Sequence, residues 1–322
     1  MIESAKTPKV SVCVATYNQK DYIRQCLQSI VDQETDFDFE VIVGDDASTD
    51  GTADIVMEYA DKYPELILPI IHKLNMGAVE TIIHIYRLAK GKYIAHMDGD
   101  DFSLPGKLQV QVDALDANQD CVMCTHDVFV VNKNSKIISH SFLKHRAGVN
   151  DLSDLYKMLP FFAHSSKMFV NDSASSFYDG LTHESIDIEI HVEQAKKGNI
   201  YHIDQCFGGY RLLTGISSAG ARINRIIPAA ARRIYSEALK SCDSECDSNC
   251  IKKYYAKAIL TYAYQSALYG RPADSREYAK ESISIKTFSL VQVCVLLVSF
   301  IPFASLILSN AIKFCKDMRL RR

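Results

Sequence analysis

The first 120 residues alternate between continuous apolar runs and amphipathic stretches. The apolar runs are VSVCVA (10–15), FEVIVG (39–44), ELILPII (65–71) and KYIAHM (92–97). Such runs are typical of strands buried on both faces of a parallel sheet. Between the runs, apolar residues recur at helical spacing, in stretches that begin near Asp21, after the polar DDASTDGT, at Gly77 and at Pro105. This alternation predicts βαβ units and a mostly parallel sheet with helices on both faces.

The pattern after residue 120 is less regular. Residues 121–142 predict two strands joined by a turn at 132–135. DIEIHVEQAKK (187–197) predicts a helix that Gly198 ends. Almost all of 223–285 has helical periodicity, interrupted by turns at CDSECDSNC and GRPADS. We therefore expect an α/β domain followed by a helical extension.

Composition narrows the class of protein. The chain has 322 residues, of which 48% are hydrophobic and 23% charged, as expected of a globular protein with a sizeable core. The formal net charge of −3 gives no reason to expect a nucleic acid as partner. Ten cysteines, several of them within apolar runs, and an N-terminus without a signal-peptide pattern predict a cytosolic catalytic part with reduced thiols.

One group of cysteines has regular spacing. Cys242, Cys246 and Cys250 are four residues apart, which would place them on one face of a helix. A metal site is one interpretation, but the spacing matches no common zinc signature and no histidine lies nearby. The sequence favours free thiols at the surface.

Polar residues follow three of the predicted strands directly. TYN (16–18) follows the first strand, DDAS (45–48) the second, and DGDD (98–101) the fourth. Ligands of open α/β sheets bind beyond the carboxyl ends of the strands. We therefore expect these three stretches to line one crevice.

The chemistry of this rim points to a metal-bridged phosphate ligand. The first turn, ATYNQK, has no glycine, and the chain has neither GxGxxG nor GxxxxGK[ST] to cradle phosphate with backbone N–H groups. An acidic rim cannot bind phosphate directly, but carboxylates are ligands for Mg²⁺ or Mn²⁺, which bridge to phosphate oxygens. Such a cation would also screen the repulsion among Asp98, Asp100 and Asp101.

Three stretches together carry a resemblance to a known family: VSVCVATYNQKDYIRQCLQSIVDQ, VIVGDDASTDGT and GKYIAHMDGDDFSLPGKLQVQV. In order and spacing they resemble the inverting glycosyltransferases of family 2, which have the GT-A fold. The resemblance covers about residues 8–215. It implies an α/β sandwich around a central, mostly parallel sheet and a DxD motif that binds a divalent metal and the diphosphate of a nucleotide-sugar donor.

The resemblance also implies roles for individual residues. Asp98 would contact the ribose or the metal, and Asp100 would be the metal ligand. Asp46 would hydrogen-bond uracil. The remaining residues expected near the nucleotide are Thr16, Tyr17, Asn18, Asn75 and Gly77.

Inverting transfer needs a general base that takes the proton of the attacking acceptor hydroxyl. Family 2 places this acid at the start of a late helix, and SIDIEIHVEQAKKG puts Asp187 there, with Ile186 where Glu or Gly is common. Alternatively, Asp187 only caps the helix. Glu184 and Glu189 are the candidates if the register is shifted.

Two further positions come from the resemblance. The segment IYHIDQCFGGYRLLTGIS resembles the closing part of the family domain, in which Arg211 would brace the diphosphate or the active-site loop. The histidine that often follows is replaced by Leu213, so an imidazole metal ligand from that position is not expected. His164 either contacts a sugar or is a satisfied buried histidine.

The end of the chain suggests membrane contact. Residues 288–312 carry no charge and are long enough to span a bilayer, and KFCKDMRLRR follows with five basic residues. Pro302 is as compatible with a kinked or re-entrant segment as with a straight span. A buried helical hairpin is the alternative. We expect the protein at the cytoplasmic face of the membrane, peripheral or anchored by this segment.

These observations predict three parts: a GT-A domain (1–222), a helical extension (223–286) and a membrane-associated segment (287–322). The expected activity is that of a metal-assisted inverting glycosyltransferase of the hexosyltransferase type. It would move sugar from a UDP-sugar to a glycan or lipid-linked acceptor in cell-surface polysaccharide synthesis. The alternatives are a membrane-docked, non-catalytic sugar-nucleotide binder and a nucleotidyltransferase, which would normally have a Gly-rich, basic first loop.

Overall fold

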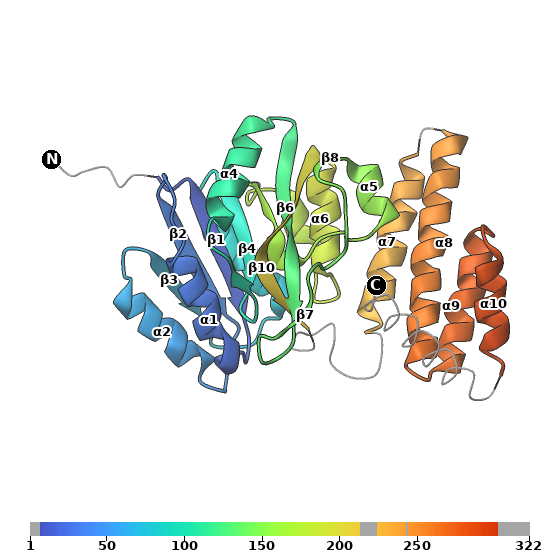
Figure 1. The fold of residues 1–322 in the computed structure, drawn as a ribbon, viewed down its shortest axis with the longest axis horizontal. Coiled ribbons are helices and arrows are strands. Elements are labelled where there is room, and N and C mark those ends of the chain that lie inside the picture. The colour runs from blue at the N-terminus through green and yellow to red at the C-terminus, as the bar shows by residue number, and fades with distance from the viewer. Residues whose placement is uncertain (1–6, 213–223, 243, 302–322) are drawn as a thin grey trace. The chain divides into compact units, whose positions relative to one another are not determined.

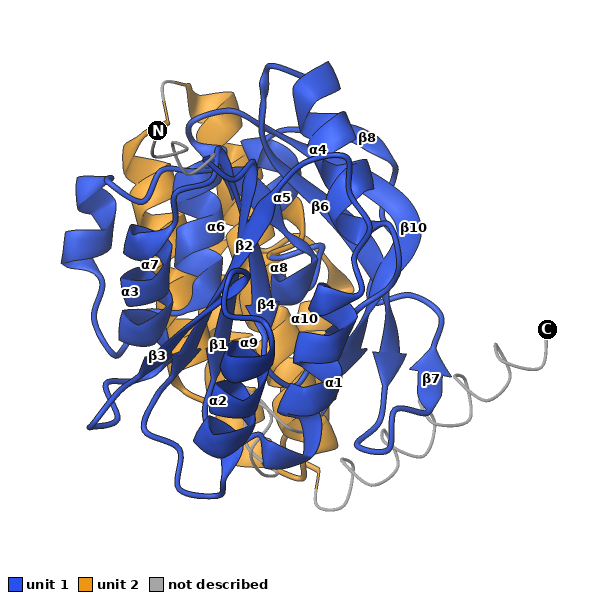
Figure 2. Cartoon of the chain, turned by 90° about the vertical axis from the view of Figure 1, so that its left-hand side faces the viewer, with its two compact units in different colours: residues 1–155, 160–215 blue, residues 156–159, 216–322 orange. Residues whose placement is uncertain are grey.

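The computed structural model describes residues 7–212, 224–242 and 244–301. It divides the chain into two compact units, which are described separately (Figure 2). The first unit consists of residues 1–155 and 160–215, and the second of residues 156–159 and 216–322.

One mixed sheet forms the centre of the first unit (Figure 1). Its main path has the order β3-β2-β1-β4-β9-β6-β10-β5, with β7 paired to β6 and β8 to β10. The strands are β1 (Val10–Thr16), β2 (Phe39–Asp45), β3 (Ile67–Ile71), β4 (Tyr93–Asp98), β5 (Phe102–Ser103), β6 (Cys121–Val131), β7 (Ile137–Ser139), β8 (Gly148–Asn150), β9 (Met168–Val170) and β10 (Asn199–Arg211). β1 to β4 pair in parallel, as do β6 and β10, whereas β9 runs antiparallel to both β4 and β6.

Helices connect the strands of this unit. They are α1 (Lys20–Val31), α2 (Thr52–Lys62), α3 (Ala78–Leu88), α4 (Lys107–Ala117), α5 (Leu152–Lys157) and α6 (Asp187–Ala195), with 3₁₀ turns at His164–Ser166 and Ser176–Gly180. The expected mixture of a parallel sheet with crossover helices is therefore present.

The sheet is covered on both faces because the side chains of β1 alternate between two cores. Val12 and Val14 belong to a cluster with residues of α1, α2 and α4. Cys13, which lies between them, donates from its thiol to the carbonyl of Ile85 in α3. On α1, Ile23 and Leu27 are fully buried, which stabilises the packing by about 2 kcal/mol for each side chain.

Several parts of this unit differ from the sequence prediction, among them β5, β8, β10 and α5, which were not predicted. β3 starts at Ile67 rather than residue 65, because the N–H groups of both Leu66 and Ile67 turn back to the carbonyl of Tyr63. The three residues of β9 were not predicted, since a strand this short has no readable period. It matters because it joins β4 to β6.

The second unit is helical: α7 (Ile226–Lys240), α8 (Glu245–Leu268), α9 (Pro272–Ile285) and α10 (Leu290–Val298). Its core includes Ile259, Tyr278 and Val295, from α8, α9 and α10. The CDSECDSNC segment is not a turn throughout. Ser244 caps α8 by accepting from the N–H of Asp247, so Cys246 and Cys250 are exposed residues of its first turns.

The apolar end of the chain is only partly described. Within the described residues, no helix is both long and apolar enough to cross a membrane. α10 has nine residues, and Leu290, Leu297 and Ile301 expose more than half of their surface. The basic tail and residues 302–312, on which the membrane interpretation depends, lie outside the described residues.

Candidate active site

The three polar stretches predicted to share a crevice lie at one edge of the sheet. In the register of the parallel strands, Thr16 at the end of β1 is opposite Asp45 of β2, and Ala15 is opposite Asp98 of β4. The carboxyl ends of β1, β2 and β4 therefore bring TYN, DDAS and DGDD together.

The first two stretches are tied by hydrogen bonds. The N–H of Asn18 donates to the Ser48 hydroxyl over 2.8 Å, and the Asn18 side-chain oxygen accepts from the N–H of Thr49, also over 2.8 Å. Asn18 has φ of 51°, in the left-handed region that asparagine tolerates better than most residues. This turn leaves Tyr17 exposed, with its ring accessible to a ligand.

Asp46 fixes the loop that carries the other expected nucleotide residues. Its two carboxylate oxygens accept from the N–H groups of Met76 and Gly77, over 2.7 and 2.9 Å. Its carbonyl accepts from the side-chain amide of Asn75 over 3.1 Å. Asp46 therefore clamps this loop to the end of β2, a role that sequence reasoning did not predict.

The acidic turn is built around Gly99. A Cβ at this position would lie 2.5 Å from the Gln19 side-chain oxygen and 2.7 Å from the Thr16 hydroxyl, so no other residue fits without movement. Thr16 itself is buried and donates to Gln19 over 2.8 Å. The tight turn holds Asp98, Asp100 and Asp101 close together.

Asp101 is the internal member of this acidic turn. Its carboxylate accepts from the Ser165 hydroxyl over 2.6 Å and from the N–H of Arg211 over 2.7 Å. Burial, together with the negative charges of Asp100 and Asp98, raises the pKa of Asp101 well above its usual range. The three carboxylates of the turn therefore oppose one another's ionisation, a repulsion that a divalent cation would relieve, and their hard oxygen donors fit Mg²⁺ or Mn²⁺.

Arg211 braces this turn from within. It is 2% exposed and donates from Nε to the carbonyl of Asp100 over 2.7 Å. Its other nitrogens donate to the carbonyl of Asn132 and to the side chain of Gln25. Of its two expected roles, these contacts correspond to bracing the active-site loop. Leu213, two residues further, lies outside the described residues.

Asp187 is the first residue of α6. Its side chain is 36% exposed and lies 3.8 Å from the Nδ1 atom of His164. Desolvation raises the pKa of Asp187 to about 6, the charge of Asp98 adds to the shift, and the charge of Lys167 opposes it. The carboxyl group is thus mostly ionised at neutral pH and basic enough to accept a proton.

The two alternative acids are placed differently. Glu189 reaches back to accept from the N–H of Ile186 over 3.0 Å, so Glu189 has the structural role at the start of α6. Asp187 accepts from a local N–H, that of Ile188. Glu184 lies at an exposed position in the turn before the helix.

Histidines lie close to Asp98 and Asp187. Nδ1 of His164 is 2.8 Å from Nε2 of His191, and the ring centroids of His164 and His96 are 3.7 Å apart. Within the described ranges, two groups bring three potential metal ligands within 4.8 Å of one another: His96 with Asp98 and His164, and His164 with Asp187 and His191. Asp100 belongs to neither.

Sequence reasoning missed His96 and His191, although local signals existed. The strand period of two places His96 on the same face of β4 as Asp98. The helix period places His191 one turn after Asp187. That both meet His164 depends on non-local packing, which no local pattern reveals.

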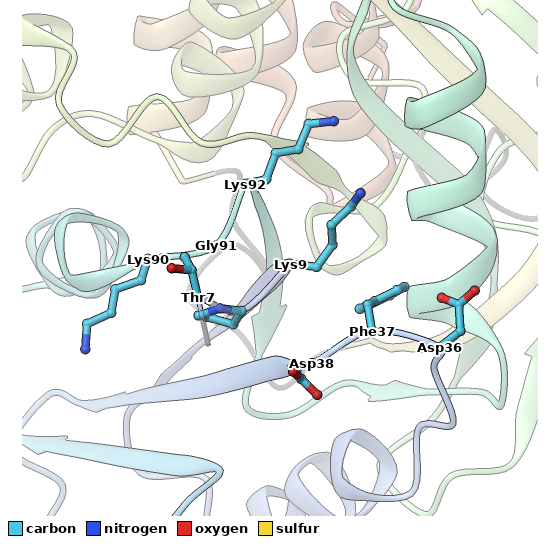
Figure 3. Close-up of a pocket in the computed structure, with 9 residues that line it drawn as sticks. Thr7, Lys9, Asp36, Phe37, Asp38, Lys90, Gly91 and Lys92 are labelled. Atoms are coloured by element: carbon cyan, nitrogen blue, oxygen red, sulfur yellow. The ribbon is translucent and has the colours of Figure 1, made fainter. Parts of the chain in front are cut away.

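A separate pocket lies at the opposite edge of the sheet (Figure 3). Lys9, Asp38 and Lys92 line it, and each immediately precedes a parallel strand. Both lysines also pair with Asp116. The pocket is therefore distinct from the acidic turn at the carboxyl ends.

Comparison with known proteins agrees with this arrangement. The model of the family described as "Glycosyl transferase family 2" matches residues 11–211. The chain belongs to this family. The matched region runs from β1 to the end of β10 and so contains the acidic turn and Asp187.

Curated relatives support the family assignment. An uncharacterized protein of Mycobacterium bovis, Mb1547, is 41% identical over 123 residues, 38% of this chain and 36% of that protein. The putative glycosyltransferase EpsE of Bacillus subtilis is 39% identical over 112 residues, 35% of this chain and 40% of EpsE. The putative teichuronic acid biosynthesis glycosyltransferase TuaG of Bacillus subtilis is 38% identical over 106 residues, 33% and 41% of the two chains. The matches thus span about two fifths of these relatives' length.

Solved structures show the same fold. S. aureus TarS 1-349 in complex with UDP-GlcNAc has a TM-score of 0.61 at 18% identity, covering 94% of this chain and 88% of that one. The mannosyltransferase PcManGT from Pyrobaculum calidifontis, in complex with GDP-Man and Mn2+, has a TM-score of 0.56 at 17% identity, covering 95% and 87%. The predicted GT-A fold with C-terminal helices is confirmed.

Proposed function

We propose that the protein is an inverting, metal-assisted glycosyltransferase that uses a UDP-sugar. The observation that carries this proposal is geometric: Asp98, in the acidic turn, and Asp187, at the start of α6, each have a carboxylate oxygen within 4.8 Å of a nitrogen of His164. The residue expected to bind the donor and the residue expected to act as base therefore share one crevice. The nucleotide-sugar complexes of the two structural neighbours support the donor class.

In the proposed mechanism, Asp98 and Asp100 would hold a divalent cation, which would supply neutralisation of the charge that develops on the leaving diphosphate. Arg211 and the backbone around Gly99 keep both carboxylates in place. The exposed ring of Tyr17 and the loop clamped by Asp46 line the nucleotide side.

Asp187 acts in the chemical step. Its carboxylate takes the proton of the acceptor hydroxyl as that oxygen bonds to the anomeric carbon from the face opposite the diphosphate. The bond between the anomeric carbon and the diphosphate oxygen breaks, and UDP leaves with its electron pair. A pKa of about 6 suits a general base that works near neutral pH.

The proposed acceptor is a glycan or lipid-linked precursor of a cell-surface polysaccharide, at the cytoplasmic face of the membrane. The uncharged residues 288–312 and the basic tail support membrane contact.

A non-catalytic sugar-nucleotide binder would not need a base with a raised pKa. A nucleotidyltransferase would normally have a Gly-rich, basic first loop, which ATYNQK is not.

A panel of nucleotide sugars tests this proposal. The full-length protein is mixed with each sugar in Mn²⁺ or in EDTA, and both melting temperature and slow donor hydrolysis are recorded. A transferase should be stabilised by one donor class only when metal is present, and should release UDP slowly. Stabilisation without any donor hydrolysis would favour the binding protein, and indifference to all nucleotides would refute the proposal.

A further inference from the structure

The buried histidine group raises a separate question, because one of its nitrogens has no partner. His164 is 8% exposed, and its Nδ1 atom is engaged with His191. Its other nitrogen, Nε2, is buried without a hydrogen-bond partner among the described residues. Either tautomer leaves it unsatisfied, as an N–H without an acceptor or a lone pair without a donor, and such groups are costly.

Potential ligands lie beside the ring of His164. His96 and Asp98 are two residues apart on β4, and Nε2 of His96 lies 3.1 Å from Oδ1 of Asp98. These two residues and His164 bring three ligand atoms within 4.8 Å of one another. Ligand atoms around a tetrahedral zinc ion lie about 3.3 Å apart, given bonds of about 2.0–2.1 Å. Small side-chain movements would therefore close the group around an ion.

The outer contacts of both imidazoles also suit an ion. A histidine that binds metal through one nitrogen normally donates from the other. Nδ1 of His96 lies 2.9 Å from the Tyr86 hydroxyl, and Nδ1 of His164 lies 2.8 Å from Nε2 of His191. Metal at both Nε2 atoms would thus leave each Nδ1–H with an acceptor.

The neighbouring group is less suitable. An ion bound between Nδ1 of His164, Nε2 of His191 and Asp187 would leave the other nitrogen of each histidine as a donor. Both of those nitrogens, Nε2 of His164 and Nδ1 of His191, are buried and have no hydrogen-bond partner in the described part of the chain. The group of His96, Asp98 and His164 is therefore favoured.

We propose that His96, Asp98 and His164 form an inner site for a borderline transition-metal ion such as Zn²⁺, with both imidazoles binding through Nε2. Two neutral imidazoles and one carboxylate favour such an ion over Mg²⁺. The site shares Asp98 with the proposed site of the donor's cation but does not include Asp100, so the two sites adjoin and are separated by their other ligands. The ion would fix the end of β4 to the 3₁₀ turn at His164–Ser166.

The test uses the full-length protein stripped of metal, without nucleotide. Zn²⁺ binding is followed by calorimetry. Co²⁺ is used as a spectroscopic substitute, because its visible absorption identifies sites that have a low coordination number and imidazole ligands. X-ray absorption of the zinc-loaded, unmutated protein counts imidazole ligands and needs no variant. We expect one ion per chain with two imidazoles. A zinc ion with fewer than two imidazoles, or no binding, would overturn the proposal.

Variants identify which histidines bind the ion. His164→Gln should weaken Zn²⁺ binding by more than the roughly 10–100-fold that loss of an outer partner costs, whereas His191→Gln should fall within that range. His84→Gln is the matched control, since His84 also pairs with a histidine, His72, over 2.9 Å but belongs to neither ligand group. Equal loss in His164→Gln and His191→Gln would place the ion in the neighbouring group and overturn the proposal.

A last variant separates this site from the proposed transferase activity. Asp100→Ala should abolish metal-dependent UDP binding and leave the Co²⁺ spectrum intact. If Asp100→Ala removes both metal-dependent UDP binding and the Co²⁺ spectrum, the ion is the donor's cation and the inner site does not exist. If the unmutated protein binds Co²⁺ through two imidazoles but never binds UDP, the inner site stands and the proposed function fails.

Discussion

The backbone N–H of Arg211 donates to the carboxylate of Asp101 over 2.7 Å, although 110 positions separate the two residues. The side chain of Arg211 holds the carbonyl of Asp100 at the same time. The last residue of β10 therefore determines the shape of the acidic turn after β4.

The first prediction concerns this brace. Arg211→Met should cost about 3 kcal/mol of stability, because it leaves buried carbonyls without their donor. Urea denaturation measures the loss. Arg24→Met is the control: it removes an exposed pair with Glu58 and should leave the midpoint unchanged. Equal effects of the two variants would contradict the role assigned to Arg211.

Loss of the proposed base should affect chemistry alone. Asp187→Asn keeps the size of the side chain but accepts no proton, so transfer should fall roughly 10²–10⁴-fold. Melting temperature and UDP–Mn²⁺ affinity should stay nearly unchanged. Glu189→Gln should instead lower stability slightly, because Glu189 holds the N–H of Ile186. If Glu184→Gln is the inactive variant, the base has been assigned to the wrong residue.

The pH profile gives an independent measure of Asp187. Since its pKa is raised to about 6, activity should increase with pH through that value as the carboxyl ionises. The charge of Lys167 lowers the pKa of Asp187, so Lys167→Met should move the acid limb to higher pH. Initial rates measured from about pH 4.5 to about pH 8 in both proteins provide the readout. An acid limb that stays in place in Lys167→Met would argue against Asp187 as its source.

The dependence of activity and of UDP binding on metal should be lost when the acidic turn is altered. Asp100→Ala should abolish most activity and weaken UDP binding in Mn²⁺, because the diphosphate loses its bridging cation. Calorimetry with and without EDTA separates metal-dependent from metal-independent binding. Asp36→Ala, at the pocket on the opposite edge, should change neither quantity. Tight UDP binding by the unmutated protein in EDTA would remove the basis of this prediction.

The proposed contact of the apolar end of the chain with the membrane is best tested by truncating the chain after Ile301. Gln292 of α10 is fully buried and donates to the Ser282 hydroxyl over 2.9 Å, so removing α10 would damage the helical unit. Deleting residues 302–322 should move the protein from the membrane to the soluble fraction, with UDP–Mn²⁺ binding intact. Full-length protein that is monomeric without detergent would contradict the membrane proposal.

Local pattern was sufficient to predict the half of the fold that carries the three polar stretches. β1, β2 and β4 are continuous apolar runs, and the register of neighbouring parallel strands then brings their polar ends together. The short antiparallel β9 was beyond such reasoning, because its two partners are far away in the sequence. The resemblance to the family predicted the position of Asp187 at the start of a helix. It did not predict the nearby histidines, because their contacts are also made between residues far apart in the sequence.

Asp46 shows a different limit of sequence reasoning. The resemblance implies a hydrogen bond with uracil, and the structure adds a second role, in which the carboxylate accepts from the N–H groups of Met76 and Gly77. A residue type states which bonds a side chain can make, but not which backbone groups come within its reach. Only the packed loop determines that.

The pairing of β5 with β10 has a consequence for biosynthesis. β5 follows the acidic turn directly, and its partner residues, Gly208 and Gly209, come about a hundred positions later in the chain. At about 5–20 residues per second, a ribosome needs roughly 5–20 s to make that stretch. β1 to β4 can pair during this interval, whereas the acidic turn still lacks its brace. We therefore expect a nascent chain arrested before β10 to resist proteases over its first strands while remaining unable to retain a nucleotide.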